Sequence, residues 1–176
     1  VKECIRVGLL GAGTVGSGVL NVLEENTAEI EKKVGVPIKV AKILVRDIKK
    51  TKELAAKYQL TDKIEDIVED PQIDIVVELI GREHPAKEYI AAALEHQKNV
   101  VTANKDVLAK YGKELFPLAE ENKVDFMFEA SVGGGIPIIR PLKSCLAANK
   151  ITSVMGIVNG TTNYMLTKMS QENMDY

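Results

Sequence analysis

The feature that most constrains this chain is the sequence VGLLGAGTVG at residues 7–16, in which a short apolar strand stands directly before a G-x-G-x-x-G turn. An apolar-periodic segment follows at once at residues 19–23. Strand, glycine turn and helix in this order are typical of a dinucleotide-binding site. The alternative is a structural glycine-rich turn in another kind of α/β domain.

In a dinucleotide site each glycine has its own task. Gly11 permits the tight turn, Gly13 lets the backbone approach a pyrophosphate, and Gly16 lets the helix pack close to the strand. The helix then begins at Thr14 and Val15, and its first turn offers unsatisfied N–H groups and a positive dipole end to the anion. The turn therefore predicts a phosphate-binding helix N-terminus.

Apolar strands and helical segments alternate along the rest of the chain, and the strands are apolar on both faces. Such strands belong to a parallel sheet with helices on either side, so we expect a Rossmann-type, doubly wound α/β fold. The expected strands after the first are 38–45, 73–80, 99–102 and 125–128, and the expected helices are 14–34, 49–58, 85–96 and 112–122.

The character of the sequence changes at a glycine-rich loop near residues 130–137. Such loops commonly join two domains. We expect a dinucleotide-binding domain over residues 1–130, and a linker with the beginning of an α+β catalytic domain over 131–176. In this second part we expect a helix at 138–146, a strand at 151–158 and a helix after residue 159.

Composition narrows the function classes. The 176 residues are 45% hydrophobic and 27% charged, with a net charge of −2 and both signs interleaved, which argues against a nucleic-acid partner. No apolar run approaches 18 residues, so no membrane span is expected. Cys4 and Cys145 lie far apart without a C-x-x-C spacing, and we interpret both as buried small hydrophobes of a cytoplasmic protein. His84 and His96 are too isolated for a metal site and are expected on the surface of one helix.

The end of the second strand bears on the choice of cofactor. Arg46 stands where an NAD-selective carboxylate is expected, and Asp47 follows it, 31 positions past Gly16 instead of the customary gap of about 20. Arg46 with Lys49 or Lys50 forms a clamp for a 2′-phosphate. This favours NADP, with NAD kept open because Asp47 could reach a ribose. The alternative is that Arg46 pairs with Asp47 or faces solvent.

Lys105 is the candidate for acid–base chemistry. It follows the strand at 99–102 and so emerges at the carboxyl edge of the sheet, where ligands bind in open α/β folds. Oxidation of an alcohol requires a group that takes the hydroxyl proton, and a lysine suits this role if its pKa is lowered. The alternative is a solvated lysine that opens a helix.

Five motifs in one order carry a family resemblance: GLLGAGTVG at 8–16, ELIG at 78–81, VTANK at 101–105, FEASVGGGIP at 128–137 and NGTTNY at 159–164. Together they resemble homoserine dehydrogenase over essentially the whole chain. The resemblance implies interconversion of L-homoserine and L-aspartate 4-semialdehyde with a nicotinamide cofactor. The family's chain is considerably longer and supplies further acidic residues and a second lysine, so this sequence is similar to its N-terminal portion.

The resemblance also implies roles for individual residues. It places Lys105 between substrate and nicotinamide, Gly81 at the nicotinamide ribose and Ser131 near the carboxamide, although Arg82 stands where the family usually has a second glycine. It implies substrate contacts from Gly160 and Thr161, whose simpler interpretation is a helix cap. It further implies a monovalent cation such as Na⁺, and the ligands carried over are Glu129, Val132, Gly134 and Ile136.

We also expect a homodimer formed through the following domain. Two other functions remain as alternatives. One is another NAD(P)-dependent amino-acid or sugar dehydrogenase, which the NGTTNY segment at 159–164 disfavours. The other is a nucleotide-sensing module without turnover.

Overall fold

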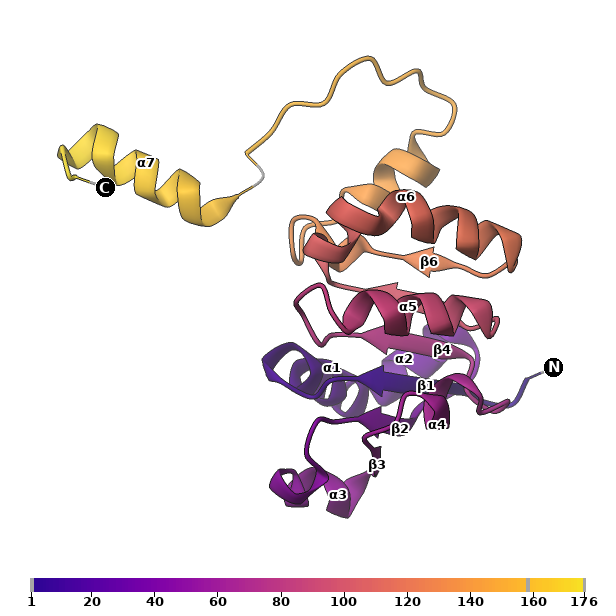
Figure 1. The fold of residues 1–176 in the computed structure, drawn as a ribbon. Helices are drawn as coiled ribbons and strands as arrows, with labels where there is room; N and C mark the ends of the chain where they lie inside the picture. Colours follow the sequence, from indigo (N-terminus) through magenta and orange to yellow (C-terminus); the bar gives the residue numbers. More distant parts are fainter. Residues whose placement is uncertain (1, 158, 176) are drawn as a thin grey trace. The chain divides into compact units, whose positions relative to one another are not determined.

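The structure, a computed structural model, describes residues 2–157 and 159–175 (Figure 1). The chain divides after Phe128 into two compact units, Val1–Phe128 and Glu129–Tyr176. Each unit is described by itself below.

The first unit is built on a six-stranded sheet in the order β3-β2-β1-β4-β5-β6, and all of its strand pairs are parallel (Figure 1). From β1 the chain first moves outward through β2 and β3, and then returns to β1's other side to add β4. The doubly wound fold expected from the sequence is thus confirmed. The strands are β1 (Ile5–Leu10), β2 (Ile38–Leu44), β3 (Gln59–Thr61), β4 (Ile75–Glu78), β5 (Asn99–Thr102) and β6 (Phe126–Met127).

Helices cover both faces of this sheet, and neighbouring residues of one strand serve opposite faces. Leu9 packs in a cluster with Leu20 of α1, whereas Leu10 packs in a second cluster with Ile90 of α5 and Leu115 of α6. All five side chains are buried. The helices of this unit are α1 (Thr14–Glu25), α2 (Thr27–Val34), α3 (Lys52–Lys57), α4 (Glu65–Val68), α5 (Ala86–Glu95) and α6 (Lys105–Glu121), with a 3₁₀ turn at Ile48–Lys50.

Several boundaries differ from the sequence expectation. The predicted helix 14–34 is two helices that meet at Asn26, whose side chain donates to the Val22 carbonyl at 3.1 Å. Thr27 Oγ1 likewise donates to the Leu23 carbonyl at 2.6 Å, and such local bonds compete with the helix. Helix α6 begins at Lys105, seven residues before its expected start at 112, and β3 and α4 were not expected.

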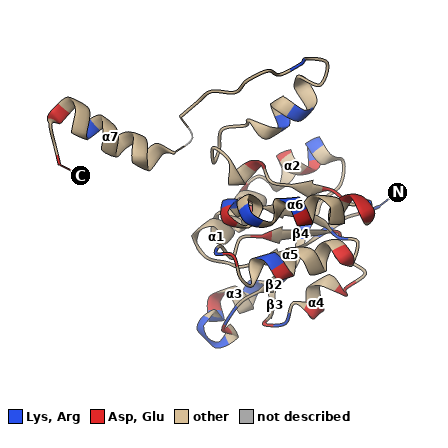
Figure 2. Cartoon of the chain, turned by 45° about the horizontal axis from the view of Figure 1, so that its top comes forward, with Lys and Arg blue, Asp and Glu red and all other residues tan. Residues whose placement is uncertain are grey.

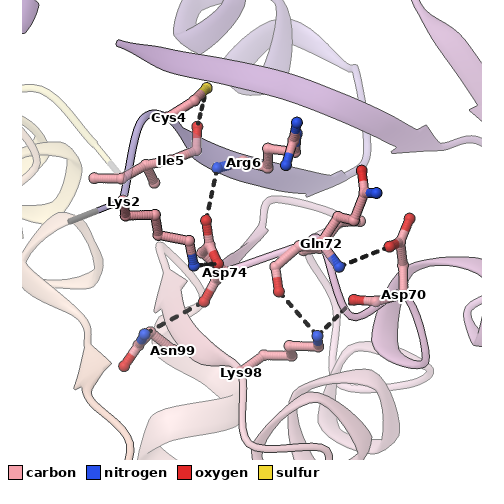
Figure 3. A network of polar contacts seen from close by, with 10 residues as sticks. Lys2, Cys4, Ile5, Arg6, Asp70, Gln72, Asp74, Lys98 and Asn99 are labelled. Carbon is pink, nitrogen blue, oxygen red and sulfur yellow. Dashed lines mark hydrogen bonds and ion pairs between the residues drawn. The ribbon is translucent and has the colours of Figure 1, made fainter. Parts of the chain in front are cut away.

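At the amino edge of the sheet, hydrogen bonds and an ion pair join residues at or just before the starts of β1, β4 and β5 (Figure 3). Lys98, only 8% exposed, donates to the carbonyls of Asp70 at 2.6 Å and Ile73 at 2.9 Å. Burial lowers the pKa of Lys98. The Asp74 carboxylate accepts the Arg6 N–H at 2.9 Å and pairs with Lys2. This network ties the starts of β1, β4 and β5 together.

The second unit contains α7 (Gly160–Glu172) and a short helical stretch that continues into a π-helical turn at Pro141–Cys145. The described residues 151–157 form no strand, so the strand expected at 151–158 is wrong as far as residue 157, and Val158 lies outside the described residues. A single segment of β-branched residues forms no sheet unless a partner strand supplies backbone hydrogen bonds. Cys145 is exposed and Cys4 half-buried, so neither is the buried hydrophobe expected.

Charge is distributed as the sequence indicated. Figure 2 shows acidic and basic residues interleaved along the helices, with a basic stretch at the turn before α3. His84 and His96 are both exposed, but they flank α5 on either side and do not belong to it. Among the described residues, no helix is both long and apolar enough to cross a membrane.

Candidate functional site

The glycine turn between β1 and α1 has the geometry that a phosphate cradle requires. Gly11 has φ +93°, a conformation that L side chains rarely adopt. A Cβ on Gly16 would lie 2.2 Å from the Gly11 carbonyl oxygen, so any side chain there would clash with backbone. A Cβ on Gly13 would meet nothing within 4 Å. Gly13 therefore borders open space, as expected where the backbone faces a ligand.

The start of α1 offers donors to that space. Gly13 is the N-cap residue and has no side chain that could cap the helix. The first turn of α1 contains no acidic residue. Helix N-termini leave their first N–H groups without intrahelical partners, and the helix dipole adds a partial positive charge. Thr14 and Val15 in this turn are exposed. These residues fit the pyrophosphate of a dinucleotide.

A cavity of about 610 Å³ adjoins the turn. It brings together Gly11, Gly13, Arg46 and Lys50, which the sequence had assigned to the cofactor from two separate segments. Lys49 lines a neighbouring cavity of about 590 Å³ between α1 and α3. The walls of the first cavity also include residues that sequence reasoning missed, namely Asp62 after β3, Ile80 after β4, and Pro85 and Tyr89 at α5.

The charges at the end of β2 are arranged for an anion. The Asp47 carboxylate accepts the Lys49 N–H at 3.0 Å and lies 3.4 Å from Lys50 Nζ. Arg46 is exposed, and within the described part of the chain its guanidinium forms no hydrogen bond or ion pair. Of the two expected alternatives, an Arg46–Asp47 pair is absent among these residues, and exposure of Arg46 to solvent is observed. Asp47 is thus committed to its own turn, while Arg46 remains available.

The carboxyl ends of β4 and β5 are joined by a buried polar network. Glu78 is 0% exposed, and it accepts the Thr102 hydroxyl at 2.6 Å and the Ile80 N–H at 2.8 Å. The Thr102 hydroxyl in turn accepts the Asn104 N–H at 3.0 Å. Sequence reasoning missed Glu78 and Asn104 as site residues, although both lie within motifs that it quoted.

Lys105 is the first residue of α6 and is exposed. The preceding residue, Asn104, caps the helix by accepting the Val107 N–H at 3.2 Å. In the described chain the Lys105 ammonium has no hydrogen-bond or ion-pair partner. The structure thus places this lysine at the carboxyl edge of the sheet, on a firmly capped helix start.

The β4–α5 loop, residues 79–85, holds an unusual backbone. Gly81 has φ +71° and Arg82 φ +61°. Left-handed conformation is costly for a residue with a side chain, so Arg82 is strained where Gly81 is not. A Cβ on Gly81 would meet nothing within 4 Å, which leaves its backbone open to a ligand.

In the second unit, Glu129 begins a loop that leads to the helical stretch after Pro137. Its carboxylate accepts backbone N–H groups from Ile138 at 2.6 Å, Ile139 at 2.9 Å and Arg140 at 2.7 Å. These bonds hold the pKa of Glu129 below its usual value. Val132, Gly134 and Ile136 follow in the same loop, which Gly133 and Gly134 turn with φ +75° and +61°.

The remaining predicted residues also lie in this unit. Ser131 is half-buried in the same loop. Gly160 and Thr161 open α7, whose cap residue Asn159 accepts the Thr162 N–H at 2.9 Å. The cap at Asn159 explains why α7 begins at Gly160 and Thr161, and both of these residues are exposed. Among the described residues, no cluster of three or more His, Cys, Asp or Glu side chains could hold a metal ion.

Comparisons with known proteins agree with this geometry. The family model "Homoserine dehydrogenase, NAD binding domain" matches residues 11–129, and the model "Homoserine dehydrogenase" matches residues 137–176. The homoserine dehydrogenase of Bacillus subtilis is 49% identical over 175 residues, which is 99% of this chain and 40% of the relative.

Solved structures give the same result. A homoserine dehydrogenase from Thiobacillus denitrificans superposes with a TM-score of 0.90 at 48% identity, covering 98% of this chain and 40% of that one. A hyperthermophilic archaeal homoserine dehydrogenase in complex with NADPH has a TM-score of 0.65 at 28% identity, covering 79% and 48%. The chain spans about 40% of the length of the first relatives it matches. It belongs to the homoserine dehydrogenase family and comprises the family's NAD-binding domain and the start of the domain that follows.

Proposed function

We propose that this chain is the cofactor-binding part of an oxidoreductase that interconverts L-homoserine and L-aspartate 4-semialdehyde with NADP. The observation that carries the proposal is the glycine turn, in which Gly11 and Gly16 are required by backbone geometry and Gly13 borders open space. The cavity beside it connects this turn with the cations after β2. Membership of the family supplies the reaction.

The preference for NADP rests on Arg46. Its guanidinium has the planar donor geometry that binds a phosphate through two bonds, and Lys50 adds a second positive charge on the cavity wall. The Asp47 carboxylate, which would favour a ribose hydroxyl, is engaged by Lys49 N–H and Lys50. The archaeal relative solved with NADPH is consistent with this preference. NAD remains usable because its other contacts are the same.

The bound nicotinamide supplies the hydride chemistry. Lys105 accepts the proton that the homoserine hydroxyl loses, and returns it in the reverse reaction. Gly81 presents open backbone to the ribose next to the ring, and Ser131 is proposed to lie near the carboxamide. Gly160 and Thr161, exposed at the start of α7, are proposed to contact the amino-acid part of the substrate.

A monovalent cation such as Na⁺ is part of the proposal. Hard cations prefer oxygen ligands, and the loop offers the Glu129 carboxylate with the carbonyls of Val132, Gly134 and Ile136. Glu129 Oε2 accepts the Arg140 N–H, and a carboxylate oxygen has a second lone pair that a cation could use. Replacement of Na⁺ by choline at constant ionic strength should raise the substrate KM, and Glu129→Gln should remove that dependence.

We further propose that the enzyme is a cytoplasmic homodimer formed through the domain that follows. Cys4 and Cys145 are free thiols, which fits a reducing compartment.

The cofactor preference is tested by calorimetric titration of the chain with NADPH and NADH at one salt concentration. NADPH should bind more tightly. Arg46→Ala should weaken NADPH by about 1.5 to 3 kcal/mol, the scale of a hydrogen bond to a charged group, and leave NADH nearly unchanged. Arg6→Ala, an exposed arginine at the amino edge, is the matched control. Equal affinities for the two cofactors would overturn the 2′-phosphate clamp.

The reaction is tested in a form of the protein extended by a complete homoserine dehydrogenase domain. This form should oxidise homoserine with saturable kinetics, while the 176-residue chain alone should bind cofactor and turn over hardly at all. Cofactor binding without any turnover in the extended form would favour a nucleotide sensor. Turnover of another amino acid or a sugar in place of homoserine would indicate a different dehydrogenase.

A further inference from the structure

The residue of interest is Asn104, which uses three separate polar groups at once. Its backbone N–H donates to Thr102 Oγ1 at 3.0 Å, and its Oδ1 caps α6 by accepting the Val107 N–H at 3.2 Å. Its Nδ2 donates to the Arg82 carbonyl at 2.7 Å. Asn104 is 7% exposed. One buried side chain therefore binds both the helix that begins with Lys105 and the β4–α5 loop.

The neighbouring bonds fix the direction of this network. Because the Asn104 N–H can only donate, Thr102 Oγ1 accepts a hydrogen bond from it. The Thr102 hydroxyl in turn donates a hydrogen bond to Glu78 Oε2 at 2.6 Å. Glu78 Oε1 accepts the N–H groups of Ile80 at 2.8 Å and Gly81 at 3.4 Å. The network thus begins and ends on the β4–α5 loop.

Among the described residues, two other polar contacts join this loop to α6, and both are exposed. Lys110 pairs with Glu83, and His84 Nε2 lies 3.2 Å from Tyr111 Oη. Exposed pairs are screened by solvent and contribute little. The Asn104 bond is shielded and is adjacent in sequence to Lys105. It is the contact best placed to set the distance between the loop and that lysine.

We propose that Asn104 is a positioning residue that holds the β4–α5 loop and Lys105 in one fixed arrangement. The inference rests on the proposed function, in which Gly81 faces the nicotinamide ribose and Lys105 accepts the substrate proton. The Nδ2 bond to Arg82 aligns these two groups. Small misplacements of reacting groups cost large factors in rate, so loss of this bond should lower kcat with little change in binding.

The test compares two substitutions in the extended form of the protein. Asn104→Ser keeps a helix-capping oxygen but loses the bond to Arg82, whereas Asn104→Ala loses both. Both variants should lower kcat by about 10- to 100-fold, and the KM for homoserine should change less than about threefold. Asn104→Ala should lower Tm more than Asn104→Ser, because it also loses the cap bond to the Val107 N–H. Asn122→Ser removes a comparable amide-to-carbonyl bond of 2.9 Å at the other end of α6, and serves as the control with unchanged kcat.

Two further readouts do not depend on turnover. In the 176-residue chain carrying Asn104→Ser, the Kd for NADPH should stay within about threefold, since the glycine turn is untouched. Hydrogen exchange of the Ile80 and Gly81 amides, which donate to Glu78 Oε1, should become at least about tenfold faster, because the loop has lost its tether.

Wild-type kcat in Asn104→Ser, or a loss of kcat in Asn104→Ala alone, would reduce Asn104 to a helix cap and overturn the inference. Unchanged hydrogen exchange would do the same. If instead Lys105→Ala leaves kcat unchanged, the proposed role of the lysine fails, and this result is distinct from a failure at Asn104 alone.

Discussion

The two edges of the parallel sheet use charged residues in opposite ways. At the amino edge, Lys98 precedes β5, and Asp70 and Asp74 precede β4; each is bound to protein partners (Figure 3). At the carboxyl edge, Arg46 and Lys105 stand exposed, without a side-chain partner in the described chain. Satisfied charges hold the strand ends together, whereas cations left without partners are available to a ligand. The two edges should therefore respond differently to the same substitution.

The largest effect is expected at the carboxyl edge. In the extended form, Lys105→Ala should lower kcat by about 10² to 10⁴, the usual contribution of a positioned acid or base, while the cofactor Kd stays within a few fold. Lys113→Ala, an exposed lysine further along α6, should leave kcat unchanged. Steady-state kinetics and cofactor titration measure both. A Lys105→Ala enzyme with full activity would show that this lysine is merely solvated.

At the amino edge the same type of exchange should affect stability. Lys98→Met leaves the Asp70 and Ile73 carbonyls without their donor, and should lower the free energy of unfolding by about 2 to 3 kcal/mol. Lys105→Met, the matched exchange at the carboxyl edge, should cost less than about 0.5 kcal/mol. Urea unfolding measures both. Equal costs at the two edges would contradict the comparison.

The amino edge should also respond to acid. Hydrogen bonds from Lys42 and from the Gln72 N–H hold the pKa of Asp70 below its usual value. A carboxyl whose pKa is lower in the folded state stabilises the protein fully above its unfolded pKa, about 3.9, and this contribution is lost as pH falls through the folded pKa. Asp70→Asn should therefore lower stability at pH 7 and flatten the decline between about pH 5 and 3. Urea unfolding across this range provides the check, and a decline as steep as in the wild type would rule Asp70 out as its source.

The smallest effect concerns backbone strain, which both edges share. Arg82 at the carboxyl edge and Gln97 at the amino edge have φ +61° and +57°. Glycine adopts this conformation without penalty, so Arg82→Gly and Gln97→Gly should each stabilise the protein by about 0.5 to 1 kcal/mol. Thermal unfolding of the two variants tests this. A loss of stability in either would mean that its side chain contributes more than its backbone costs.

The sequence predicted most of the first unit because its strands are apolar runs bounded by glycine or proline, and such runs need little context. The three residues of β3 and the four of α4 are too short to show a period, and so Asp62, which follows β3, was missed as a cavity residue. The start of α6 was missed because the helix was expected only from residue 112, and Asn104 was considered only as part of the VTANK motif at 101–105. The capping role of Asn104 depends on a side-chain rotamer that the amino-acid sequence does not reveal.

The candidate site was predictable only where backbone geometry demands a residue type. Gly11 and Gly16 could be assigned from their spacing, since other residues would clash or be strained. Arg46 and Lys105 were found by their place after a strand, and their roles stay predictions. Glu78 could not be recognised, because its contact with the Thr102 hydroxyl joins two residues from different strands that are remote in sequence.

The close approach of Gly16 to the Gly11 carbonyl limits the mutations that this turn can accept. Every amino acid other than glycine would place a Cβ at position 16 only 2.2 Å from that oxygen. No amino acid other than glycine can therefore occupy position 16 with only a small steric penalty. A single-base change that replaces Gly16 should therefore disrupt the turn, whereas one that replaces the exposed Arg46 should leave the fold intact.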